Sequence, residues 1–100
     1  MTYEQLTEAT KRKKVLVVDD NRMNLVLAKR LIEQLGLEAD IALDGAEALE
    51  KMKETEYAMV FMDHFMPEMD GVETTQRIRK LEPSYCKSVP VAVLTANTEM

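Results

Sequence analysis

Residues 60–71 read VFMDHFMPEMDG, an apolar run that ends in a carboxylate at Asp63 and passes directly into turn-forming sequence. A short apolar run bounded by turn signals is typical of a buried strand. A second apolar run, Val15–Val18, also ends in acids, at Asp19 and Asp20. The carboxyl ends of parallel strands meet at one edge of a sheet, where ligands of such folds bind. We therefore expect the three acids to converge and to bind a hard divalent cation.

Strand and helix patterns alternate along the chain on both sides of this stretch. The pairs Asp44 with Glu47 and Asp70 with Glu73 are capping signatures that predict the starts of two helices. The alternation predicts right-handed βαβ units in an α/β fold, with a doubly wound parallel sheet between layers of helices. The predicted elements are a strand at 14–18, a helix ending before Gly36, a strand at 37–42, a helix at 46–53, a strand at 57–62, a helix ending near Lys80 and a strand at 89–94.

The first and third predicted helices each carry an apolar face, which we expect to pack against the sheet. The predicted buried face of the first helix comprises Met23, Leu27, Ala28, Leu31, Ile32 and Leu35. The predicted buried side of the third helix comprises Val72, Thr75 and Ile78.

The composition is that of one small globular domain. The chain has 100 residues, of which 46% are hydrophobic and 31% charged. No apolar run approaches the length of a membrane span, and the polar start does not resemble a signal peptide. The lone Cys86 excludes an internal disulfide and fits a reducing compartment, so we expect a cytoplasmic location. A formal net charge of -5 argues against nucleic acid as a direct partner.

Three motifs, in matching order and spacing, resemble the receiver domain of two-component response regulators. They are Val-Asp-Asp-Asn at 18–21, Met-Asp followed by Met-Pro-x-Met-Asp-Gly within 62–71, and Val-Pro-Val-x-x-Leu-Thr-Ala at 89–96. The form Asp-Asp-Asn-x-x-Asn, with Asn21 and Asn24, is most similar to receivers carried on hybrid histidine kinases. The resemblance implies a flavodoxin-like fold whose strands lie in the order 2-1-3-4-5.

The resemblance also implies a role for each site residue. Asp63 would accept a phosphoryl group from the phosphohistidine of a histidine kinase or phosphotransfer domain. Asp19 and Asp20 would bind Mg²⁺ together with Asp63 and the backbone carbonyl of Phe65, because magnesium prefers oxygen ligands. Thr95 would contact the phosphoryl group. Such a domain catalyses its own phosphorylation and is not a turnover enzyme on a small substrate.

Each of these residues, taken alone, also has an ordinary structural interpretation. Asp19 and Asp20 could be helix N-caps, Asp63 a turn acid and Thr95 a strand-end threonine. The three motifs in register favour the functional interpretation. His64 adjoins the predicted acceptor, but a lone histidine is usually a packing or surface residue, and we assign it no role.

Receivers continue beyond the fourth strand through a helix, a strand carrying an essential lysine, and a last helix. The resemblance therefore predicts a receiver domain over 14–100 that is truncated after its fourth strand, in the order 2-1-3-4, with residues 1–13 as a linker or helical extension. An unpaired edge at the fourth strand, 91–94, is a template for pairing between chains, and a sheet face left partly bare adds apolar surface. We expect a symmetric dimer or larger homo-oligomer through this edge and face.

Two other functions remain open at this point. A truncated receiver that cannot be phosphorylated would act as a pairing or docking module, and a phosphorylation assay separates it from an active receiver. A magnesium-dependent phosphatase with an aspartyl nucleophile is disfavoured, because such sites place a second acid two residues after the nucleophile. Phe65 stands at that position here.

Overall fold

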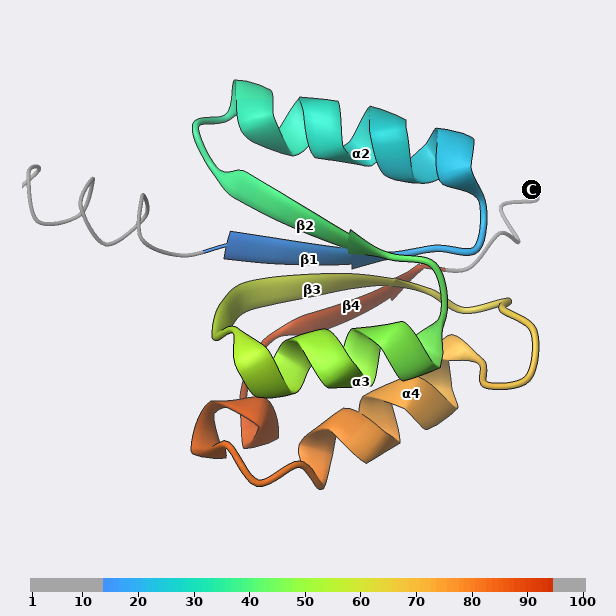
Figure 1. Cartoon of the computed structure of the whole chain (residues 1–100), viewed down its shortest axis with the longest axis vertical. Helices are drawn as coiled ribbons and strands as arrows, with labels where there is room; N and C mark the ends of the chain where they lie inside the picture. The colour runs from blue at the N-terminus through green and yellow to red at the C-terminus, as the bar shows by residue number, and fades with distance from the viewer. Residues whose placement is uncertain (1–13, 95–100) are drawn as a thin grey trace, which may run out of the picture.

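The computed structural model describes residues 14–94, which form a four-stranded parallel sheet with helices on both faces (Figure 1). The strands lie in the order β2-β1-β3-β4, so the predicted α/β fold and the strand order 2-1-3-4 are confirmed. The elements are β1 (Lys14–Val18), α2 (Arg22–Gln34), β2 (Glu38–Ala42), α3 (Gly45–Glu54), β3 (Tyr57–Asp63), α4 (Gly71–Arg79), the 3₁₀-helix η1 (Ser84–Lys87) and β4 (Val91–Leu94).

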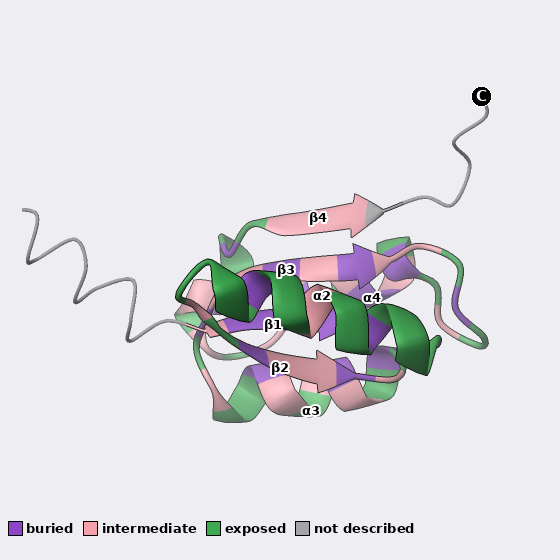
Figure 2. Ribbon diagram, turned by 90° about the horizontal axis from the view of Figure 1, so that it is seen from above, coloured by how far each residue is buried: buried purple, intermediate pink, exposed green. Residues whose placement is uncertain are grey.

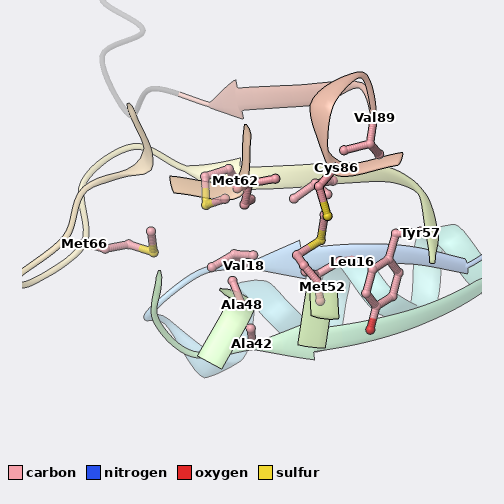
Figure 3. Packing of buried hydrophobic residues seen from close by; sticks show 12 residues of the cluster. Leu16, Val18, Ala42, Ala48, Met52, Tyr57, Met62, Met66, Cys86 and Val89 are labelled. Atoms are coloured by element: carbon pink, nitrogen blue, oxygen red, sulfur yellow. The ribbon is translucent and has the colours of Figure 1, made fainter. Parts of the chain in front are cut away.

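β1 lies inside the sheet, and its sequence fits that place. Val15–Val18 are all buried, because layers on both faces of the strand cover their side chains. α2 covers one face of the sheet, and α3 with α4 covers the other (Figure 1). On the α3 and α4 side, Leu16 and Val18 belong to a cluster with Met52 and Met62 (Figure 3). The strand that leads to the first two acids is thus fixed between two packed layers.

α2 packs on the sheet through a face that shares only Ala28 and Ile32 with the predicted one. Its buried residues are Leu25 and Ile32, and Ala28 packs against the same cluster. The rest of the predicted face is exposed, with exposed fractions of 67% for Met23, 52% for Leu27, 63% for Leu31 and 76% for Leu35. The prediction was wrong because α2 is apolar around most of its circumference, so the spacing of apolar residues does not fix how the helix is rotated.

α4 also packs by a stripe turned by one position from the predicted one. The buried residues are Gly71, Thr74 and Ile78, which share one side of the helix. Ile78 was predicted to be buried, whereas Val72 is 46% exposed. Thr75 is half-buried, and its hydroxyl donates a hydrogen bond to the carbonyl of Gly71 at 2.7 Å.

Both predicted N-caps are confirmed, and the reach-back acid is confirmed at Glu47, whereas the Glu73 carboxylate pairs with Arg77. The Asp44 carboxylate accepts a hydrogen bond from the Glu47 backbone N–H at 2.8 Å, and the Glu47 carboxylate accepts one from the Leu43 N–H at 2.9 Å. The Asp70 carboxylate accepts a hydrogen bond from the Glu73 N–H at 2.8 Å. These caps satisfy N–H groups that lack partners inside the helix, so α3 and α4 start at defined residues.

η1, between α4 and β4, was not predicted from the sequence. The hydroxyl of its Tyr85 lies 2.7 Å from the carbonyl oxygen of Met52 and 2.6 Å from that of Thr55. These carbonyls are at the end of α3, where backbone acceptors have no partner within the helix. The neighbouring Cys86 is fully buried in the core (Figure 3). η1 therefore fastens the end of α3 to the segment that enters β4.

β4 is an edge strand in the described part of the chain. Within residues 14–94 it pairs with β3 alone, and Figure 2 shows it at the outer side of the sheet. The predictions for 1–13 and for Thr95 lie outside the described residues. Within the described range, no helix has both the length and the apolar character needed to cross a membrane.

Candidate functional site

Three acids from two neighbouring strands lie together at the carboxyl edge of the sheet. β1 and β3 pair in parallel with Val18 opposite Met62, so the residues that follow them emerge side by side. Asp19, Asp20 and Asp63 each offer a carboxylate oxygen, and these oxygens all lie within 4.8 Å of one another. The structure thus brings together the three acids that the sequence pattern selected.

Asn21 and Asn24 fix the orientation of Asp19. The N-cap of α2 is Asn21, whose side-chain oxygen accepts hydrogen bonds from the N–H groups of Met23 at 2.9 Å and Asn24 at 3.2 Å. Asp19 in turn accepts from the Asn21 N–H at 2.9 Å and from the Asn24 side-chain amide at 3.2 Å. The helix-cap interpretation of Asp19 and Asp20 is therefore wrong, because Asn21 has that role. The sequence pattern did not predict this support of Asp19 by Asn24.

The site is electrostatically strained as a cluster of carboxylates. Burial raises the pKa of the Asp63 carboxyl, and the charges of Asp19 and Asp20 raise it further, while a hydrogen bond from the Phe65 backbone N–H at 3.3 Å acts in the opposite direction. Because the folded chain then binds a proton at Asp63 more tightly than the unfolded chain, the metal-free fold gains stability as the pH falls through the raised pKa and loses it as the pH rises through that value.

The donor set fits a hard divalent cation. Clustered carboxylate oxygens are the ligands that magnesium takes in proteins, usually with several retained waters. A cation bound between the acids would also remove the repulsion that raises the pKa of Asp63. Asp20 is exposed and Asp19 and Asp63 are half-buried, so the cluster is open to solvent.

Phe65 and His64 follow Asp63 at the start of the loop that leaves β3. Phe65 is 57% exposed, and its ring centroid lies 4.5 Å from that of His64. The Nδ1 atom of His64 is buried and has no hydrogen-bond partner within residues 14–94. The structure thus places the Phe65 side chain at the surface, next to the acid cluster that its backbone N–H contacts.

Gly71 is a further residue of the site that our sequence reasoning missed. Its N–H donates a hydrogen bond to the His64 carbonyl at 2.8 Å. A Cβ atom at this position would lie 2.6 Å from the carbonyl oxygen of Asp63 and 2.9 Å from the Cα atom of His64. The sequence pattern marks the Asp-Gly pair as part of a motif and as the start of a helix, and the structure adds that the glycine lets α4 approach the backbone of Asp63.

A sequence model of the response regulator receiver domain matches residues 15–100. Among curated proteins, the chain is 40% identical over 78 residues to probable histidine kinase 1 of Oryza sativa subsp. indica, covering 78% of this chain and 8% of that protein. It is 37% identical over 90 residues to hybrid signal transduction histidine kinase K of Dictyostelium discoideum, covering 85% of this chain and 7% of that protein. The chain thus spans under a tenth of the length of these relatives.

Solved structures share the fold. The chemotaxis protein CheY4 of Vibrio cholerae superposes with a TM-score of 0.80 at 32% identity, covering 87% of this chain and 71% of that one. The receiver domain of a sensor histidine kinase of Pseudomonas aeruginosa, described with a magnesium ion in its active site cleft, superposes with a TM-score of 0.78 at 29% identity, covering 85% and 68%. The family match, the curated relatives and the shared fold together establish that this chain belongs to the response regulator receiver domains of two-component signalling.

Proposed function

We propose that the chain is a phosphoacceptor that takes a phosphoryl group onto Asp63 in a two-component phosphorelay. Mg²⁺ is held by the carboxylates of Asp19, Asp20 and Asp63 and by the backbone carbonyl of Phe65. The observation that carries the proposal is the convergence of three carboxylate oxygens within 4.8 Å at the carboxyl edge of a receiver fold. The donor is the phosphohistidine of a histidine kinase or phosphotransfer domain, which is supported by the histidine kinases among the relatives.

Asp63 acts as the nucleophile in this proposal. One of its carboxylate oxygens attacks the phosphorus atom in line, the phosphorus–nitrogen bond of the donor breaks, and the electron pair returns to the imidazole. When bound, Mg²⁺ supplies positive charge that offsets the charge of the phosphoryl oxygens. Thr95, outside the described residues, contacts the phosphoryl group in the product. Each transfer leaves an acyl phosphate on Asp63, so the output is a modified domain and not a released product.

The open position of the acid cluster supports transfer from a protein donor. Asp20 and Phe65 are both exposed, so a histidine on another protein can approach the carboxylates from solvent. We place the chain in the cytoplasm, where a reducing environment suits its single buried thiol at Cys86.

Magnesium is expected to stabilise the folded chain through the three acids. Because the ligand set forms only on folding, a ligand concentration 100 times the Kd adds about 2.7 kcal/mol to the free energy of unfolding. Asp20→Ala should remove most of this gain, and thermal unfolding with and without MgCl₂ measures it. Glu82→Ala, which removes an exposed acid between α4 and η1, is the matched control and should keep the response. Equal responses of the native and Asp20→Ala chains would refute the metal assignment.

We also propose that this 100-residue chain forms a homodimer through the β4 edge and the exposed apolar residues of α2. Two observations support the dimer: β4 pairs with β3 alone within residues 14–94, and α2 exposes Met23, Leu27, Leu31 and Leu35. An unpaired strand edge and a contiguous apolar stripe both favour association.

Light scattering over a wide range of protein concentrations is expected to give the mass of a dimer. Leu27→Lys with Leu31→Lys should shift the population toward monomer, because the two charges lie in the middle of the exposed stripe. Arg30→Ala changes another exposed residue of α2 and leaves the stripe apolar, so it is the control. A well-folded monomer at every concentration would contradict the proposal.

A further inference from the structure

The segment that follows the phosphoacceptor, residues 64–70, forms a closed loop between β3 and α4, which we name the acceptor loop. Its two ends are joined by the hydrogen bond from the Gly71 N–H to the His64 carbonyl at 2.8 Å. The turn inside the loop is tight, because the Met69 N–H lies 2.7 Å from the Pro67 carbonyl and Glu68 has a φ of 70°. A positive φ at a residue other than glycine is strained and persists where surrounding contacts impose it.

The end of the acceptor loop that leads into α4 packs on Gly45, the first residue of α3. A Cβ atom built at Gly45 would lie 2.9 Å from the Sδ atom and 3.4 Å from the Cβ atom of Met69, and 2.5 Å from the hydroxyl oxygen of Thr74. Met69 therefore occupies space that only a glycine leaves open, and we name this contact the Gly45 notch. Gly45 is buried and Met69 is half-buried, so the contact shields apolar surface from water.

The loop makes limited contact with α3 around this point. A hollow of about 130 Å³ lies between the two, and it is lined in part by Pro67, Glu68 and Met69 from the loop and by Asp44, Gly45 and Ala46 from α3. Pro67 and Glu68 are exposed. The Met69 side chain is thus the part of the loop tip that is seated on the helix.

The beginning of the loop is held in a different way. Met66 is 8% exposed and lies at the edge of the core cluster on the α3 and α4 side (Figure 3). Phe65 lies between Asp63 and Met66, and its side chain is exposed. The position of its backbone carbonyl therefore depends on how the segments before and after it are held. A loop fixed at Met66 and at Met69 has less freedom to tilt than one fixed at Met66 alone.

We propose that Met69, seated in the Gly45 notch, is a positioning residue that presets the acceptor loop for magnesium. The inference rests on the proposed function, because it assigns the Phe65 carbonyl of the loop to the metal. Met69 touches neither the metal nor the phosphoryl group. It acts by holding the loop in the geometry that ligation requires, and residues that orient metal ligands typically change metal affinity by about 10-fold or more when they are lost.

The test is the Kd for magnesium, measured by titration calorimetry on folded, metal-free protein. Met69→Ala empties the notch and should raise the Kd by about 10-fold. Met69→Leu refills the notch with a side chain of similar volume and should restore an affinity near that of the native chain.

Ile32→Val is the matched control, because it lowers stability from a buried position of α2 in the cluster on the other face of the sheet, which contains no residue of the acceptor loop. It should leave the Kd unchanged. A native Kd in the Met69→Ala chain would overturn the positioning role and leave the proposed function standing. An equal loss of affinity in the Ile32→Val chain would do the same. A native chain that fails to bind magnesium would overturn the metal site itself, and the inference with it.

Discussion

Asp63→Asn is expected to abolish phosphorylation of the chain by a small phosphodonor in the presence of magnesium. The native chain should gain one phosphoryl group that hydroxylamine removes, as it does from an acyl phosphate. An asparagine amide has nearly the same shape as the carboxylate but is not a nucleophile, so the fold is kept while the reaction is lost. Intact mass before and after hydroxylamine treatment measures both results.

Asp70→Asn provides a control of the same chemistry on the same loop. Asp70 caps α4, and asparagine is an equally good N-cap, so this variant should keep both the fold and the modification. A phosphoryl group that survives in the Asp63→Asn chain would place the acceptor at another residue.

The strand and helix order and the meeting of the acids could be predicted from the sequence. Short apolar runs marked β1, β3 and β4, and the capping pairs at Asp44 and Asp70 located the starts of α3 and α4 to within a residue. Such signals are local, because a cap or a buried strand depends on residues that are close in the sequence. Because β1 and β3 are parallel, Asp19 and Asp63 then lie at the same edge of the sheet.

The rotation of each helix about its own axis could not be predicted, because it depends on which side of the helix the sheet and the neighbouring helices cover. α2 offers an apolar residue on nearly every side, and packing on β1 and β2 buries Leu25 beside the predicted Ile32 and leaves Leu27 exposed. On α4, the close contact at Gly71 sets which side faces the sheet, and it leaves Val72 exposed.

The supports of the site escaped prediction for a similar reason. Gly45 and Met69 are far apart in the sequence, and neither carries a group that suggests chemistry. Asn24 was visible only as part of a motif, while its contact with Asp19 requires the turn made by the Asn21 cap. Such contacts join different parts of the fold, so they can be identified only after the helices and strands have been placed relative to one another.

Gly71→Ala is expected to destabilise the fold by about 3 kcal/mol, the upper end of what a single added methyl costs in a packed site. The new Cβ would lie 2.6 Å from the Asp63 carbonyl oxygen and 2.9 Å from the His64 Cα. Both are backbone atoms of the strand end, so neither can rotate away as a side chain could. The better helix propensity of alanine, about 1 kcal/mol, offsets only part of this cost.

Urea unfolding of the native and variant chains measures the difference, and Gly36→Ala separates its cause from ordinary glycine effects. Gly36 has a φ of 88° with no atom within 4 Å of an added Cβ, so alanine there costs about 1 kcal/mol of backbone strain and no clash. The Gly71 variant should be the less stable of the two, although Gly71 lacks a positive φ. If Gly71→Ala proves as stable as Gly36→Ala, α4 does not press on the acceptor backbone. If the larger loss is found, residue 71 must be glycine because α4 lies so close to the backbone of Asp63. The position of the nucleophile and the position of the helix then depend on each other.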